Sequence, residues 1–180
     1  DDASSDAPRR RRDRRGRRHG RPGEIHVIKA LILTPTRELA LQISDCFADY
    51  GKYTGLRHTV IFGGVKQRPQ TEKLERGVDI LIATPGRLLD HFERGKLLMT
   101  GVQMLVIDEA ARVDNALYFA VRPMLAVSHG RLIALSTPFG KRGWFYDAWH
   151  SPENWHRQCI TAELCPRIAP EFLQEERQAL

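Results

Sequence analysis

The stretch MLVIDEAARVDN, Met104 to Asn115, decides how the rest of the sequence is interpreted. Four apolar residues are followed directly by two acids, Asp108 and Glu109. A short run that is apolar at every position is typical of a strand buried on both faces, as the strands of parallel sheets are. The two carboxylates then lie where that strand ends. We therefore expect a parallel sheet with an acidic site at the end of one strand.

Other short apolar runs occur on both sides of this stretch and alternate with amphipathic segments. Leu39, Ile43, Phe47 and Tyr50, for example, recur at helical spacing between the first two runs. The expected strands are residues 28–34, 57–62, 79–84, 103–108 and 131–137, with a sixth short strand near residues 156–162. This alternation predicts an α/β fold, a mostly parallel sheet with flanking helices.

Three of the expected strands end in the same dipeptide. The pairs are Thr34-Pro35, Thr84-Pro85 and Thr137-Pro138. Proline disfavours the helical conformation of the residue before it and suits the first turn of a helix, so each pair is expected to switch strand into helix. Helix N-termini at the carboxyl edge of a parallel sheet are good sites for phosphates. The alternative is that the three pairs are turn chemistry alone.

Asp108 and Glu109 have the arrangement of a Walker B segment. We assign Asp108 to Mg²⁺, bound through water, and Glu109 to the water that attacks a γ-phosphate. A purely structural acid pair is the less favoured alternative, because buried acids without a cation are costly. The phosphate loop G-x-x-x-x-G-K-[ST] that such a site needs does not occur in the sequence; Gly140-Lys141 is followed by Arg142. We therefore expect poor ATP hydrolysis, or none, from this chain alone.

The first 23 residues differ in composition from the rest. They contain nine arginines and four aspartates, which supply +5 of the net charge of +6, and no apolar residue larger than alanine or proline. We expect a disordered basic arm that attracts nucleic acid through its phosphates, although a solvated linker is an equal alternative. With no long apolar run and three cysteines without a CxxC pair, we expect a cytoplasmic protein with no membrane contact and no disulfide-linked partner.

Four segments together resemble one protein family. ALILTPTRELALQI (30–43), FGG (62–64), ILIATPGRLLDHF (80–92) and MLVIDEA (104–110) resemble the first RecA-like domain of the DEAD-box RNA helicases. The resemblance, over about residues 29–110, implies ATP and Mg²⁺ as cofactors, RNA as partner, and local duplex unwinding. In that family the matching segments contact the sugar-phosphate backbone. The residues concerned are Pro35, Thr36, Arg37, Gly63, Gly64, Thr84, Pro85, Gly86 and Arg87.

The sequence also departs from that family. The expected fold is a RecA-like sheet of the P-loop NTPase type that lacks the first strand and phosphate loop, and no second RecA-like domain follows. Ala111 stands where the last Asp of the signature is expected, and Ser136-Thr137-Pro138 stands where Ser-Ala-Thr is expected. The resemblance implies that Ser136 and Thr137 couple hydrolysis to unwinding by contacting the signature segment. Both ends of that contact are altered.

Residues 108–180 are similar to the ATPase portion of a phage terminase large subunit, in which DEAARV and STPFGKRGWFY are the expected segments. We therefore hypothesise a hybrid reading frame. Its domains are an arm at 1–23 and an incomplete RecA-like domain at 24–180, helicase-like to 110 and terminase-like from 111. The leading functional hypothesis is part of an ATP-dependent RNA helicase that is inactive as an ATPase alone. The alternatives are part of a DNA-packaging terminase ATPase and a non-catalytic nucleic-acid-binding remnant.

Overall fold

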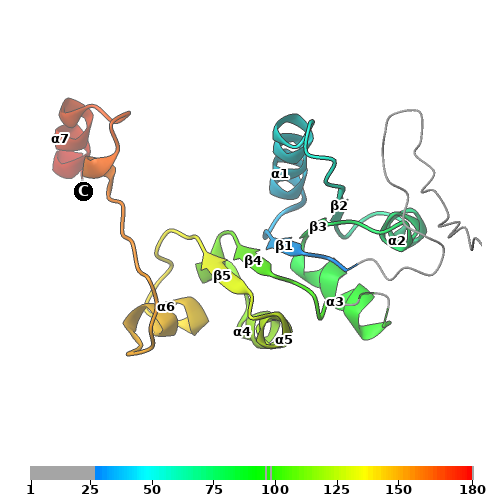
Figure 1. Cartoon of the computed structure of the whole chain (residues 1–180). Helices are drawn as coiled ribbons and strands as arrows, with labels where there is room; N and C mark the ends of the chain where they lie inside the picture. The colour runs from blue at the N-terminus through cyan, green and yellow to red at the C-terminus, as the bar shows by residue number, and fades with distance from the viewer. Residues whose placement is uncertain (1–26, 96, 98, 180) are drawn as a thin grey trace, which may run out of the picture. The chain divides into compact units, whose positions relative to one another are not determined.

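Five strands form one sheet in the part of the chain that the structure, a computed structural model, describes: residues 27–95, 97 and 99–179. The strands are β1 (Ala30–Leu33), β2 (His58–Ile61), β3 (Ile80–Ala83), β4 (Met104–Ile107) and β5 (Arg131–Ala134). All pair in parallel, in the order β2-β3-β1-β4-β5 (Figure 1). The predicted parallel sheet is confirmed, and each strand is shorter than the apolar run that predicted it.

Helices follow the strands along the chain. They are α1 (Arg37–Tyr50), α2 (Gln67–Glu75), α3 (Pro85–Glu93), α4 (Asn115–Val121), α5 (Met124–Ser128) and α6 (Gly143–His150), with a short 3₁₀ helix η1 (Ala110–Arg112) after β4. Helix α1 lies on one face of the sheet, and α3, α4 and α5 lie on the other (Figure 1). The predicted α/β layering is therefore confirmed.

The core under α1 shows why this helix packs where it does. Ala40 of α1 is buried in one cluster with Ile32, Ile80 and Ile82, and the partly buried Ile43 and Phe47 pack against this cluster. Each large aliphatic side chain buried in this way stabilises the fold by about 1.5–3 kcal/mol. Tyr50, the fourth residue of the expected apolar face, is 86% exposed, because the helix extends beyond the sheet.

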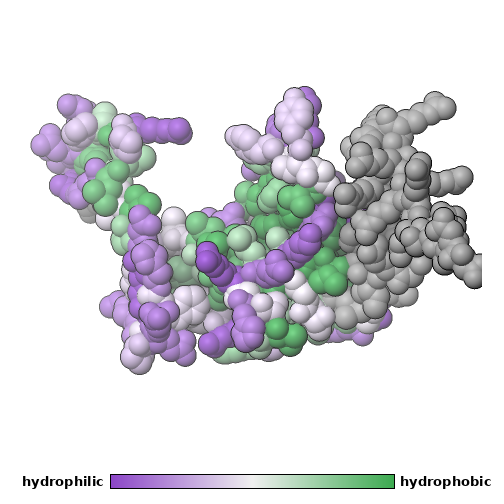
Figure 2. Space-filling view, in the orientation of Figure 1, coloured by the Kyte–Doolittle hydropathy of each residue, from purple (hydrophilic) through white to green (hydrophobic). Residues whose placement is uncertain are grey.

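Burial decreases toward the β5 end of the sheet. On the α1 face, Val106 is paired in register with Ile133, which is 40% exposed, and Met104 is exposed to the same extent. Figure 2 shows apolar surface in this region, beside the area that α1 covers. The contrast with the fully buried β3 follows from the position of α1, which packs over β1, β2 and β3.

Two of the three Thr-Pro pairs act as predicted. Thr84 precedes α3 with Pro85 in its first turn, and Thr34-Pro35 leads into α1 within two residues. The prediction for Thr137-Pro138 is wrong, because no helix begins before Gly143. Gly140 has a positive φ (78°), a conformation outside the right-handed helical region, and a loop leads from β5 to α6, whose first residue, Gly143, also has a positive φ (83°).

The sixth strand predicted near residues 156–162 is also wrong, since these residues pair with no strand in the described structure. Arg157 instead donates to the carbonyl oxygens of Ala148 (2.9 Å) and Ser151 (2.7 Å) at the end of α6. These bonds fix the chain direction locally without a strand partner. The apolar pattern alone did not contain this information.

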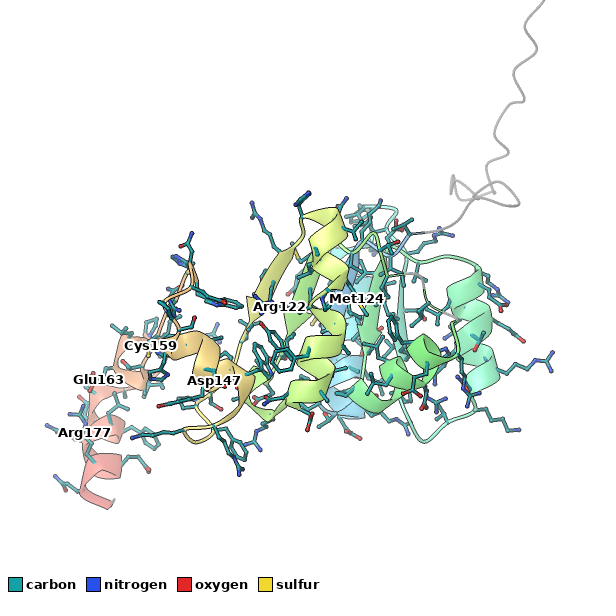
Figure 3. All side chains as sticks on the ribbon, turned by 90° about the horizontal axis from the view of Figure 1, so that it is seen from below. Arg122, Met124, Asp147, Cys159, Glu163 and Arg177 are labelled. Carbon is teal, nitrogen blue, oxygen red and sulfur yellow. The ribbon has the colours of Figure 1, made fainter. Side chains whose placement is uncertain are left out.

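The chain divides into two compact units, with the boundary after Tyr146. In the second unit, η2 (Ala162–Leu164) and α7 (Pro170–Ala179) are joined by an ion pair between Glu163 and Arg177 (Figure 3). Among the described residues, no helix is both long and apolar enough to cross a membrane. The prediction of a basic arm at residues 1–23 lies outside the described residues.

Candidate functional site

The loops that follow the strands all lie at one edge of the sheet, because all five strands run in the same direction. In spatial order this carboxyl edge carries the glycine turn after β2, the start of α3, the start of α1, the acid pair after β4 and the loop after β5. The residues predicted for phosphate binding and for hydrolysis are thereby brought to the same edge from separate parts of the sequence.

The start of α1 presents a helix N-terminus with an adjacent cation. Thr36 caps the helix, and its Oγ1 accepts a hydrogen bond from the Leu39 amide at 3.2 Å. Arg37, the first helical residue, is exposed, and its guanidinium lies 4.8 Å from the centre of the Phe62 ring. Free amides, the positive end of the helix dipole and a guanidinium together favour an anion here.

The glycine turn after β2 is fixed by Gln70 of α2. The Gln70 side chain accepts from the Phe62 amide (3.1 Å) and donates to the Phe62 carbonyl (3.0 Å), and Gln70 is only 7% exposed. Gly64, two residues further on, has φ of 80°, which glycine adopts without strain. The turn is therefore held at its base and open at its tip.

Arg87 connects this turn to α3. Its guanidinium donates to the Val65 carbonyl oxygen at 2.9 Å, so the TPGR segment and the glycine turn are in direct contact. One helical turn later, His91 is fully buried, and neither ring nitrogen has a hydrogen-bond partner among the described residues. Burial, and next the positive charge of Arg87, lower the pKa of His91 below its ordinary value.

The acid pair lies at the end of β4 in a strained backbone. The Asp108 amide continues the strand ladder by donating to Leu33 (2.9 Å), and Asp108 Oδ1 accepts from the Glu109 amide (3.0 Å). Glu109 is left-handed, with φ of 51°, a conformation that costs a non-glycine residue about 1–2 kcal/mol. Its carboxylate lies 3.4 Å from Nε of Arg112. Strain of this kind is common at functional sites.

The contact between the signature segment and the segment after β5 is present despite the changes in sequence. The Ala111 amide donates to Oγ of Ser136 at 3.1 Å, and the Ala110 amide donates to the Leu135 carbonyl at 2.9 Å. Because the bond to Ser136 uses a backbone amide, it does not require an aspartate side chain at position 111. Thr137 is exposed and contributes its carbonyl oxygen, which accepts from the Ser136 hydroxyl.

Asp108 and Glu109 are both partly exposed, and carboxylate oxygens of this kind suit Mg²⁺ bound through water. A group of three or more potential metal ligands does not occur within the described ranges, and Asp108 is the residue that would hold Mg²⁺. The residues present suit a nucleoside triphosphate less well than they suit Mg²⁺. The lysine and glycine loop that would hold its phosphates do not occur in the 180 residues.

Three residues described above were not predicted from the sequence: Gln70, His91 and Arg112. Arg112 could have been found, because it lies three residues after Glu109, a spacing at which side chains of a helical segment meet. Gln70 could not, since nothing in QRPQTEKLE distinguishes it from Gln67.

The sheet order and the composition of its carboxyl edge define a RecA-like domain, and comparison with known proteins agrees. A family model described as DEAD/DEAH box helicase matches residues 19–137. ATP-dependent RNA helicase DBP2 from Chaetomium globosum is 47% identical over 92 residues, 51% of this chain and 16% of that protein. DBP2 from Pyricularia oryzae is 48% identical with the same coverage.

A crystal structure of a DEAD box protein from Methanococcus jannaschii has a TM-score of 0.52 and 31% identity, covering 65% of this chain and 33% of that one. The family match extends over more than half of the chain. The chain belongs to the DEAD/DEAH box helicase family. It spans 16% of the length of the two curated relatives.

Proposed function

We propose that this chain is the part of an ATP-dependent RNA helicase that binds the nucleic-acid backbone, and that it contacts phosphates through the carboxyl edge of β1, β2 and β3. The observation that carries the proposal is the contact between two predicted segments. Arg87 of TPGR donates to Val65, beside the glycine turn, and Arg37 of PTREL lies over Phe62 at the base of the same turn.

The three segments therefore form one connected surface with two guanidiniums, an open glycine turn and two helix N-termini. The contributing residues are Pro35, Thr36, Arg37, Gly63, Gly64, Thr84, Pro85, Gly86 and Arg87. Guanidiniums and backbone amides bind phosphates without reading bases. We therefore expect binding that is indifferent to base sequence.

The experiment compares the affinities of the chain for single-stranded RNAs of equal length and different sequence. Arg87 is half-buried. Arg87→Gln should weaken binding to all of the RNAs by a similar factor, about two- to fivefold for one charge contact. Arg94→Gln, which removes an exposed arginine just beyond the end of the same helix, is the matched control. Equal affinities for the two variants would contradict the proposal.

We propose further that Asp108 and Glu109 are the hydrolytic pair of the whole protein, with Asp108 holding Mg²⁺ and Glu109 orienting the attacking water. The 180-residue chain itself is not expected to turn over ATP, because it contains no phosphate loop. The relatives named ATP-dependent RNA helicases support the pair's role in the family. Phosphate release from ATP by the purified chain, in the presence of Mg²⁺ and at ordinary helicase rates, would contradict the expectation that the chain alone does not hydrolyse ATP.

A finer proposal concerns origin: residues after about 110 derive from a terminase-type ATPase joined to the helicase at the signature strand. One observation supports it, Ala111 at the altered signature position, whereas the helicase family match extends past the proposed join to Thr137. The same segment would make DNA packaging the alternative function. Sequencing one uninterrupted template molecule across codons 100–120 tests the join, and a preference of the chain for duplex DNA over RNA would favour the alternative.

A further inference from the structure

A second group of cations lies at the other half of the carboxyl edge, where β4 and β5 end. Arg112 belongs to η1, and Lys141 and Arg142 belong to the loop between β5 and α6 (Figure 1). All three are exposed. Residues 137–143, TPFGKRG, carry a charge of +2 and contain no acid.

The two arginines share one aromatic ring. The Arg112 guanidinium carbon lies 4.4 Å from the centre of the Phe139 ring, and that of Arg142 lies 5.8 Å from it. Phe139 is 43% exposed. Cation–π contacts of this kind hold a guanidinium in place while its N–H donors stay available at the surface. The cluster therefore combines positioned donors with an accessible aromatic face.

The loop that carries Phe139 and Arg142 is fixed at both ends to the segment around η1. At the start, Ser136 and Leu135 accept the hydrogen bonds from Ala111 and Ala110. Its position is therefore set before any ligand arrives, which lowers the entropic cost of binding.

At the end of the loop, the Trp144 amide donates to Oδ1 of Asn115 (2.8 Å), and the indole N–H donates to the Val113 carbonyl (3.2 Å). The indole is buried and stacked on Tyr118 with ring centres 4.0 Å apart. The stacked pair of Trp144 and Tyr118 therefore fixes the end of the loop.

We propose that Arg112, Phe139 and Arg142 form a second contact site for single-stranded nucleic acid, with the arginines on phosphates and Phe139 under a base. The inference rests on the proposed function and extends it across the sheet. Single-stranded nucleic acid is favoured over other anions because aromatic faces interleaved with cations bind it without sequence preference. The site lies two strands from β1, a distance of about 10 Å, so a strand bound at Arg37 reaches it within a few nucleotides.

Binding at this site has a consequence for the acid pair. Arg112 also pairs with Glu109, whose carboxylate competes with a phosphate for the same guanidinium. A phosphate that takes the Nε donor of Arg112 would displace the Glu109 carboxylate. The second site would therefore make the carboxylate assigned to the attacking water available when nucleic acid is present.

The test measures fluorescence anisotropy of a labelled single-stranded RNA of about twelve nucleotides, within the usual footprint of one binding domain. Arg112→Gln and Arg142→Gln should each weaken binding by roughly two- to fivefold and reduce the slope of log affinity against log salt by about 0.7. Phe139→Leu should weaken binding without changing the slope. Arg131→Gln, an exposed arginine at the opposite edge on β5, is the control and should match the unchanged chain.

Arg112→Lys and Arg142→Lys separate charge from folding, because they should restore the salt slope. The inference is wrong if the glutamine variants match Arg131→Gln in affinity and slope while Arg87→Gln weakens binding. In that case the proposed function stands, and only the second site is lost. If the unchanged chain does not bind RNA, both proposals fail.

Discussion

Replacement of Gln70 by leucine tests how the glycine turn is held. The change removes two hydrogen bonds at once and leaves the Phe62 amide and carbonyl without their partner. A buried polar group without a partner costs about 1–3 kcal/mol, and both groups are only partly buried, so we expect a loss of about 2–4 kcal/mol. Against a total stability of about 5–15 kcal/mol this is a large fraction.

Urea unfolding monitored by tryptophan fluorescence measures the loss, since Trp144 is buried in the same unit. With an m value of about 2 kcal/mol/M, typical of small proteins in urea, the midpoint should fall by about 1–2 M. Gln42→Leu, which changes an exposed glutamine on α1, is the matched control. A midpoint for Gln70→Leu equal to that of the control would refute the hydrogen-bonding arrangement.

Gln70→Glu separates the two bonds, because a carboxylate still accepts from the Phe62 amide but faces the Phe62 carbonyl without a proton to donate. The folded state then favours the protonated acid, which raises the pKa of the introduced carboxyl. The free energy of unfolding of this variant, relative to the unchanged chain, should therefore increase as pH falls from about 7 to about 4. A pH-independent difference would show that the carbonyl bond contributes nothing.

Three further changes have defined outcomes. Gly64→Ala should lower the free energy of unfolding by about 1–2 kcal/mol, because Gly64 has a positive φ that alanine adopts only with strain. Gly63→Ala should not lower it, because Gly63 has no positive φ and open space around it. Equal effects of the two changes would refute the assigned turn geometry. The pKa of His91 is lowered in the folded state, so the free energy of unfolding should fall as pH decreases from about 7 to 5. His91→Leu should remove this contribution to the pH dependence, and an unchanged dependence of the free energy of unfolding on pH would contradict it. Trp144→Phe keeps an aromatic ring on Tyr118 but loses the bond to Val113. Urea unfolding followed by circular dichroism, since this change removes the fluorescent reporter, should show a cost of about 1–2 kcal/mol, and no loss would argue against that bond.

The sheet was predictable because its strands are buried on both faces and therefore apolar at nearly every position. Leu81 and Ile82, adjacent in β3, are both fully buried, and this is the feature that apolar runs report. The same rule fails where burial is incomplete. The segment at 156–162 has an apolar pattern without a neighbouring strand, and a loop in which Gly140 has a positive φ follows Pro138.

The positions of the candidate residues were predictable where a residue begins a helix or follows a strand, as Arg37 and Asp108 do. The supporting contacts were not, because they join residues far apart in sequence through geometry that no local pattern encodes. Arg87 meets Val65 across 22 positions, and the Ala111 amide meets Ser136 across 25. The bond between Ala111 and Ser136 is made by a backbone amide, so the change from Asp to Ala at position 111 of the signature does not remove it.

The central claim is that the carboxyl edge of β1, β2 and β3 binds nucleic-acid phosphates through Arg37 and Arg87. The most direct measurement is the slope of log affinity against log salt for a single-stranded RNA, compared between the chain and a variant with both Arg37→Gln and Arg87→Gln. Two lost phosphate contacts should reduce the magnitude of the slope by about 1.4. An unchanged slope would contradict the account, because the two guanidiniums would then not be in contact with the phosphates.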